Sequence, residues 1–306
     1  MGRFLLKRIL ITVLTILVII TITFIMMHAI PGGPFTREKA LPDAVLEALN
    51  KKYHLDDPLW KQYLDYLKGV ISLDLGPSFQ KTGMTVNDFI REGFPATMKI
   101  GLGAVIAIIV LGIPAGIFAA LKVGKWQDNI IMLMVTLGVT IPSFVMATLI
   151  IYIFSAKLGW LPSNGLTSWK HMIGPVIALS GFSMSFVARM TRSSMLEVLQ
   201  QDYIRTARAK GISENKVIFK HALKNALIPV ITYLGPMIAA LLTGSFVIEK
   251  IFAIPGIGKH FVESVGNRDY TVILGITIFY SLFLVVMVLI VDILYGIIDP
   301  RIKVED

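Results

Sequence analysis

The 306-residue chain contains no cysteine, so disulfides, thiolate nucleophiles and zinc–thiolate sites are all excluded. Charge is also scarce: Asp, Glu, Lys and Arg make up 16% of the residues, whereas a soluble domain carries about a quarter. Hydrophobic residues account for 55% of the chain and are concentrated in long apolar stretches. Together these properties predict an integral membrane protein.

Signals for an energy source or a catalytic centre are weak as well. The nearest match to a phosphate-binding loop is Gly256-Ile-Gly258-Lys259-His260. It has Ala253 where the motif needs its upstream glycine, and no Ser or Thr follows the lysine. The five histidines are scattered singly. We therefore expect a chain that is not an enzyme, hydrolyses no ATP itself and holds no cofactor or metal.

Six apolar stretches are long enough to cross a bilayer, which takes about 20 residues of helix. The expected spans are residues 9–30, 97–121, 130–156, 172–190, 227–249 and 273–298. The first stretch follows three basic residues but is longer than a signal-peptide core, so we expect it to be retained. The predicted fold class is an all-α integral membrane protein with six transmembrane helices.

Glycine and proline interrupt three of the expected spans, at Gly112-Ile-Pro114, at Ile141-Pro142 and at Gly235-Pro236. Broken helices at membrane depth are tolerated where they contact other helices or a water-filled cavity. The second, third and fifth spans are therefore candidates for lining a pathway. The general frequency of Gly and Pro in membrane helices explains the breaks equally well.

Lys and Arg are unevenly distributed among the short loops. Most of them fall on the side of the N-terminus, with the richest group between Arg189 and Lys224. Cytoplasmic loops carry such an excess, so both termini are expected in the cytoplasm. The expected organisation is a tail and first span (1–30), a small helical external subdomain (31–96), a transmembrane core (97–300) that includes a cytoplasmic loop at 191–226, and a cytoplasmic tail (301–306).

Ionisable residues are sparse inside the expected spans. Asp292 lies in the last span, near its cytoplasmic end. Charged residues in membranes usually pair with one another, so we expect an ion pair between Asp292 and a basic residue such as Arg189 rather than a proton relay. This scarcity argues against a proton-coupled carrier.

The segment Glu197–Pro229, EVLQQDYIRTARAKGISENKVIFKHALKNALIP, is strongly basic and joins two expected spans. Its first part predicts a helix that separates apolar from charged residues. The apolar set is Leu196, Leu199, Tyr203 and Ala207, and the charged set is Glu197, Arg205 and Arg208. Gly211 is expected to end this helix, because glycine is common at that position.

A second helix is expected to begin at Ser213, a suitable N-cap residue, and to end where Pro229 enters the next span. Its basic stripe is Lys216, Lys220 and Lys224, beside an apolar face of Phe219, Ala222, Leu223 and Ala226. The pattern predicts two short helices that meet at a glycine elbow. An amphipathic element of this kind suits anionic lipid and a protein partner about equally well.

The segment resembles the cytoplasmic "EAA" loop of ABC importer permeases. Its triplet reads Arg205-Thr206-Ala207, and Gly211 follows after three residues. The missing glutamate is a departure typical of the peptide and nickel branch. The spacing from Gly211 to Pro229 is longer than in the general pattern, so the resemblance defines the role of the loop better than its individual contact residues.

Three more stretches resemble the same branch, and together they cover nearly the whole chain. They are PGGPF with KYHLDDPLWKQYLDYLKGVISLDLGPSF, then TGSFVIEKIFAIPGIGKHFVESVGNRDY, and finally VDILYGIIDPRI. The details TRSSMLEVL, RTARAKG and PSFV are most similar to the first permease of oligopeptide importers. Dipeptide and nickel-chelate permeases share most of these motifs.

This resemblance implies an inner-membrane permease that forms half of a peptide pathway with a second permease. The implied partners are two cytoplasmic ATPase subunits, an external peptide-binding protein and membrane lipid, with no nucleic acid. The residues implied in ATPase coupling are Glu197, Tyr203, Arg205, Thr206, Ala207, Arg208, Gly211, Lys216, Lys220, Asn225 and Pro229. A dipeptide or nickel-chelate permease is the alternative, and an ATPase-independent channel or carrier is the alternative from another class.

Overall fold

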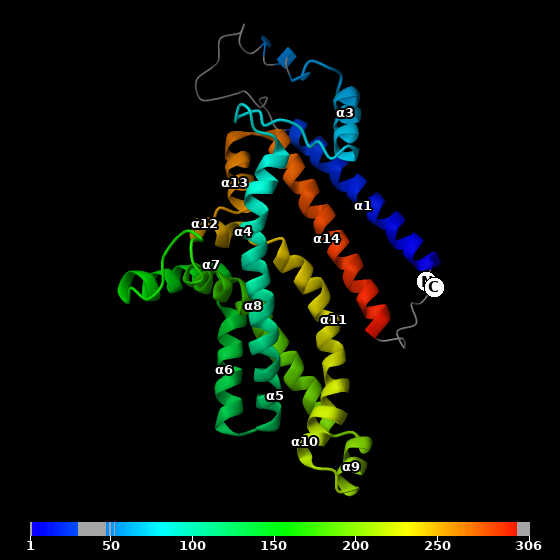
Figure 1. Cartoon of the computed structure of the whole chain (residues 1–306), viewed down its shortest axis with the longest axis vertical. Helices are drawn as coiled ribbons and strands as arrows, with labels where there is room; N and C mark the ends of the chain where they lie inside the picture. Colours follow the sequence, from blue (N-terminus) through cyan, green and yellow to red (C-terminus); the bar gives the residue numbers. More distant parts are fainter. Residues whose placement is uncertain (1, 30–46, 49, 52, 299–306) are drawn as a thin grey trace. The chain divides into compact units, whose positions relative to one another are not determined.

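The computed structural model describes residues 2–29, 47–48, 50–51 and 53–298, without the side chains of 2–8, 27 and 291–298. Within these ranges the chain is helical, and its only β-type pairing is an isolated bridge between Pro77 and Thr85 (Figure 1). The predicted all-α class is therefore confirmed. The chain divides into two compact units, residues 1–97 with 255–286 and 304–306, and residues 98–254 with 287–303.

Unit 1 contains helices from both ends of the chain. They are α1 (Gly2–Ala29), α3 (Leu59–Ile71), the first part of α4 (Val86–Ala107), α13 (Ile257–Asn267) and the first part of α14 (Tyr270–Ile298). Its buried cluster brings Val86 and Phe89 against Ile257, Val272 and Ile276. Residues 86–96, which fall in the expected external subdomain, form the first turns of α4, and this helix runs on without a break into the next expected span.

The buried carboxylate of Asp269 anchors a loop of unit 1. It accepts hydrogen bonds from the Ser78 hydroxyl and from the backbone N–H groups of Phe79 (3.1 Å) and Gln80 (3.3 Å). Ser78 and Asp269 are 2% and 3% exposed. Two stretches that carried the family resemblance, GPSF and NRDY, therefore meet at this carboxylate.

Unit 2 holds the rest of α4 and most of the other helices. These are η1 (Ile108–Gly112), α5 (Ile113–Leu121), α6 (Trp126–Thr140), α7 (Ser143–Ile150), η2 (Ile151–Lys157), α8 (Lys170–Leu199), α9 (Asp202–Ala209), α10 (Glu214–Lys216), η3 (Val217–Ala222), α11 (Leu223–Leu242) and α12 (Phe246–Ile251). The segments η1, η2 and η3 are π-helical. Helices α5, α6, α7 and α11 all pack along α8.

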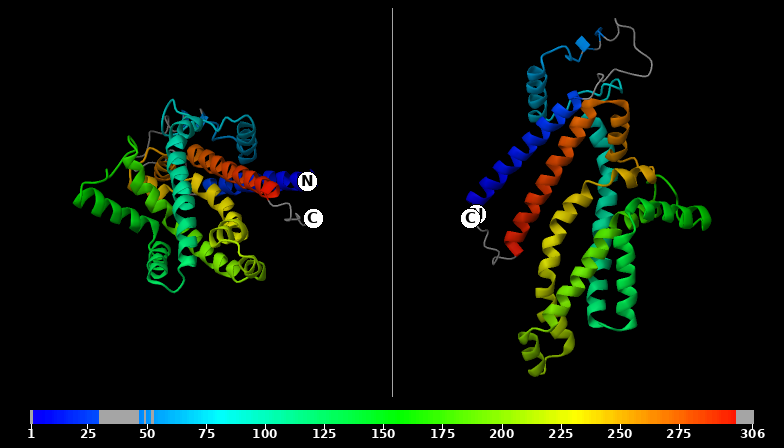
Figure 2. Two further views of the ribbon diagram at one scale, coloured as in Figure 1. Left: turned by 60° about the horizontal axis from the view of Figure 1, so that its bottom comes forward. Right: turned by 180° about the vertical axis from the view of Figure 1, so that it is seen from behind.

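Five described helices are long and apolar enough to cross a membrane, and there are six if the bent pair of α6 with α7–η2 counts as one span. The two parts of this pair are bent by 107°. The bend falls at Ile141-Pro142, one of the breaks marked in the sequence, and Figure 2 shows α7–η2 projecting sideways from α6. Proline lacks the N–H that would continue the α6 hydrogen bonds.

Besides the second expected span, whose helix begins at Val86, two more have different ends in the structure. The fourth, expected at 172–190, is α8 and continues to Leu199. The fifth, expected at 227–249, begins at Glu214 and ends at Leu242, because α10, η3 and α11 form one continuous helix. The expectation that Pro229 marks entry into a new span is therefore wrong: Pro229 lies inside α11.

Candidate functional site

Residues 200–213 connect α8 to the helix that begins at Glu214, at one end of unit 2 (Figure 1). Gln200 and Gln201 separate α8 from α9, and the Gln201 backbone is extended (φ −67°, ψ 148°). The sequence predicted one helix through this point and a second short helix after the elbow. In the structure only α9 is a short separate helix, and both of its neighbours are long helices of the core.

Gly211 forms the elbow after α9, with φ +75°. The amide of Ile212 donates to the carbonyl of Ala207 (3.3 Å) and the amide of Gly211 to that of Arg208 (2.9 Å). This pair of bonds is the Schellman motif, which places glycine at the left-handed position because it has no Cβ. The predicted role of Gly211 as the end of the helix is confirmed.

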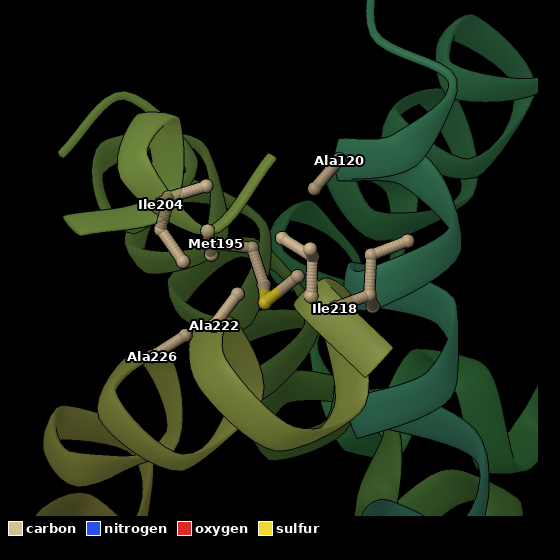
Figure 3. Packing of buried hydrophobic residues seen from close by; sticks show 8 residues of the cluster. Ala120, Met195, Ile204, Ile218, Ala222 and Ala226 are labelled. Atoms are coloured by element: carbon tan, nitrogen blue, oxygen red, sulfur yellow. The ribbon is translucent and has the colours of Figure 1, made fainter. Parts of the chain in front are cut away.

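A buried apolar cluster supports the elbow from within. It consists of Ala120 of α5, Met195 of α8, Ile204 and Ala207 of α9, Val217, Ile218 and Ala222 of η3, and Ala226 of α11. Figure 3 shows these side chains turned toward one another. Because five elements contribute to this cluster, α9 cannot tilt without disturbing it, in particular the contacts of α9 with η3. Many of the residues are small, which lets the helices approach closely.

Two predicted apolar positions are exposed instead. Tyr203 is 42% and Phe219 63% exposed, whereas Ile204 and Ile218 are buried. The break at Gln200 and Gln201 changes the helical phase between Leu199 and α9. The π-helical turn η3 changes the phase again, since its hydrogen bonds span one residue more than those of an α-helix.

Polar contacts tie α9 to the helix that follows. Arg208 donates to both carboxylate oxygens of Glu214, at 3.1 Å from Nε and 2.6 Å from Nη2. This carboxylate raises the pKa of the Arg208 guanidinium above its ordinary value. The Asn225 amide donates to the Tyr203 hydroxyl at 2.8 Å. The sequence did not predict these two contacts, because each of them joins residues of two different predicted helices.

The remaining expected coupling residues fall into two groups. Glu197, Arg205, Thr206, Lys216 and Lys220 are exposed, and Thr206 bonds back to its own helix by donating from Oγ1 to the Asp202 carbonyl (2.9 Å). Ala207 is only 7% exposed and belongs to the apolar cluster, so it is not part of the outer surface. The outer surface of the elbow thus combines charges of both signs with the exposed ring of Phe219.

The expected ion pair between Asp292 and Arg189 involves a side chain outside the described residues, and Arg189 itself is exposed. A buried pair that the sequence did not reveal lies elsewhere. Arg192 of α8 contacts Asp128 of α6, and Asp128 is 3% exposed. Asp128 lies just before the expected third span, so it was not among the ionisable residues expected inside the spans.

Two family models match the chain, with the elbow inside the larger match. "Binding-protein-dependent transport system inner membrane component" matches residues 112–304, and its N-terminal companion matches residues 1–101. The chain therefore belongs to the inner-membrane components of binding-protein-dependent transport systems, which are multi-pass permeases. The family is a membrane component of the transporter and not itself an enzyme.

Curated relatives match over the full length. The chain is 51% identical over 305 residues to the "Dipeptide transport system permease protein DppB" of Bacillus subtilis (strain 168), covering 100% of this chain and 99% of the relative. It is 45% identical to the "Oligopeptide transport system permease protein OppB" of Salmonella typhimurium, covering 99% and 100%. The sequence-based assignment to this permease family is confirmed, while the closer resemblance to oligopeptide permeases stays a prediction.

A solved structure, the "Crystal structure of an amino acid ABC transporter with histidines", has a similar fold. The TM-score is 0.52 at 20% identity, and the match covers 70% of this chain and 94% of the other. At this identity the likeness concerns the fold alone. It supports the permease architecture independently of the sequence relatives.

Proposed function

We propose that the chain is one of two permease subunits of an ATP-driven peptide importer, with both termini in the cytoplasm. It forms half of the pathway with a second permease, receives peptide from an external binding protein, and is driven by two cytoplasmic ATPase subunits. The segment of residues 200–225, which contains the elbow at Gly211, docks on an ATPase subunit. This assignment rests on the family, on the peptide transport systems named for the relatives, and on the construction of the elbow.

The observation that carries the ATPase part of the proposal is the rigidity of the elbow. The Schellman motif fixes the chain direction at Gly211, and α9 packs against η3 within an apolar cluster to which α5, α8 and α11 also contribute. A mechanical element must transmit displacement without bending, and packed apolar interfaces have discrete arrangements rather than continuous ones. A force applied to α9 is therefore passed to α8 and α11, which are core helices.

The same packing favours a protein partner over lipid. A helix that lies on a bilayer needs a free apolar face to insert between the headgroups. Two apolar residues of α9, Ile204 and Ala207, point into the protein, and its outer side carries Arg205 and Asp202, whose side chain is 96% exposed. Phe219 and Tyr203 give this surface aromatic contacts of the kind that anchor protein interfaces.

Co-purification with the ATPase subunits tests the docking surface. We expect the Phe219→Asp and Arg205→Glu variants to lose ATPase subunits while still reaching the membrane. Lys250→Glu, at an exposed position of α12, serves as the charge-reversal control and is expected to co-purify normally. Retained ATPase in both test variants, with lost binding to anionic vesicles, would contradict the proposal and favour the lipid-bound alternative.

The substrate requires a transport assay. We expect the reconstituted transporter to import labelled peptides only with binding protein and ATP, with oligopeptides preferred over dipeptides. Import of nickel chelates instead of peptides would overturn the substrate assignment. Flux through this chain alone, without ATPase subunits, would identify a channel or a secondary carrier.

A further inference from the structure

A buried ion pair joins α6 to α8 close to the elbow. Asp128 lies in the first turn of α6 and accepts two hydrogen bonds from Arg192 of α8, 2.7 Å from Nε and 2.7 Å from Nη2. The Gly124 amide, in the turn between α5 and α6, donates to the same carboxylate at 3.1 Å. One carboxylate therefore ties the turn of the α5–α6 hairpin to α8.

The hairpin lies on α8 with almost no intervening side chain at two points. A Cβ at Gly116 of α5 would come within 2.4 Å of the Ala188 carbonyl oxygen, and a Cβ at Gly138 of α6 within 2.1 Å of the Ser185 hydroxyl. Such close contacts hold the helices together but resist sliding poorly, because glycine offers no ridge to interlock. The fork of Arg192 supplies the missing directional contact, since both of its bonds must align at once.

The pair is also close to the apolar cluster of the elbow. Arg192 lies one helical turn before Met195, which is fully buried in the cluster. Ala120 of α5 belongs to the same cluster, and Ile117 packs against it. The end of the hairpin thus contacts α9 and η3 through this cluster, while Asp128 and Arg192 fix the orientation of the hairpin on α8.

We propose that Asp128 and Arg192 are positioning residues that make the α5–α6 hairpin and the elbow move as one rigid body during transport. Without the pair, the hairpin slides along α8 and part of the displacement of α9 is lost. The contribution to transport rests on the proposed function, whereas the mechanical link between hairpin and elbow does not.

The absence of cysteine allows a direct distance measurement. Spin labels at Val123→Cys, in the turn of the hairpin, and Ala209→Cys, at the end of α9, would report the separation of the two elements in the full chain in lipid nanodiscs. The parent is expected to give one narrow distance distribution. In an Asp128→Leu/Arg192→Met variant the distribution should become at least about twice as wide, because the freed hairpin samples additional positions.

The double variant leaves no buried charge unpaired, so its folding is not compromised by an isolated carboxylate. Arg192→Lys keeps the charge but loses the fork and should give an intermediate width. The matched control is Glu47→Gln, which removes an ion pair of the same 2.7 Å length to Lys51 at an exposed site. A distribution in the double variant as narrow as in the parent would overturn the proposal.

The transport measurement separates positioning from general stability. In the assembled transporter, Arg192→Lys should lower peptide imported per ATP hydrolysed by about tenfold, a factor within the usual range of coupling between sites. A merely structural role would reduce import and hydrolysis together, and an unchanged ratio would overturn the proposal. Failure of the parent itself to import peptide would overturn the proposed function and leave the distance result standing.

Discussion

Replacing Gly211 by valine tests whether the transporter depends on the shape of the elbow. Gly211 has φ +75°, and a Cβ built there meets nothing within 4 Å. The cost of the substitution is therefore conformational and not steric. A side-chain-bearing residue in the left-handed region loses about 1–2 kcal/mol, which corresponds to about a 5–30-fold larger population of the opened elbow.

Hydrogen exchange measures this opening. The Ile212 amide, bonded to the Ala207 carbonyl, should lose protection by about the same 5–30-fold factor. In the assembled transporter, Gly211→Val should still contain its ATPase subunits and hydrolyse ATP, while peptide import falls. Gly211→Asn should behave nearly as the parent, because asparagine tolerates the left-handed conformation.

Gly159→Val is the matched control, since Gly159 has φ +64° and equally open surroundings at the end of η2. This substitution has a similar conformational cost, but its position is far from the elbow in the sequence. Peptide import per ATP hydrolysed should therefore stay normal. Parental exchange and parental import in Gly211→Val would show that the transporter does not depend on the shape of the elbow. Uncoupling of Gly159→Val to the same degree would show that the effect is not specific to the elbow.

Two further predictions concern unit 1. Asp269→Asn removes the carboxylate that accepts from residues 78–80, and should lower the stability of this unit by about 1–3 kcal/mol, measured as a lower thermal midpoint and faster proteolysis of that loop. Burial, with a smaller contribution from Lys81, lowers the pKa of His260 below its ordinary 6.5. The unfolded chain therefore takes up a proton before the folded one as the pH falls through 6.5, so the thermal midpoint should decrease toward acid, and His260→Gln should flatten this decrease.

The membrane architecture was largely predictable, because the length of an apolar stretch largely determines whether it forms a span. Five of the expected spans correspond to continuous helices, and the sharp bend of the other falls at the Ile141-Pro142 break that the sequence marked. The ends were less predictable. Nothing in the composition between Glu214 and Leu227 distinguishes a separate short helix from the beginning of α11, because both present an apolar stripe beside lysines.

The sequence predicted that an elbow exists, but not which of its residues are buried and which are exposed. Gly211 was identifiable because a left-handed C-terminal residue has a strong chemical preference for glycine. Tyr203 and Phe219 were assigned to the apolar faces but are exposed, since helical phasing assumes an unbroken α-helix and the structure has an extended residue at Gln201 and a π-turn in η3. The pair of Asp128 and Arg192 depends on how the hairpin packs, which local sequence does not encode.

Magnitudes indicate which contacts give the elbow its stiffness. The Arg208–Glu214 pair is about half exposed, and surface ion pairs contribute about 0–1 kcal/mol and weaken further in salt. Full burial of a side chain such as Ile204 contributes about 1.5–3 kcal/mol, and the buried cluster contains several of comparable kind. The apolar cluster therefore carries most of the rigidity, at any ionic strength. This leaves the exposed charges of α9 free to select a partner, because the shape of the elbow does not depend on them.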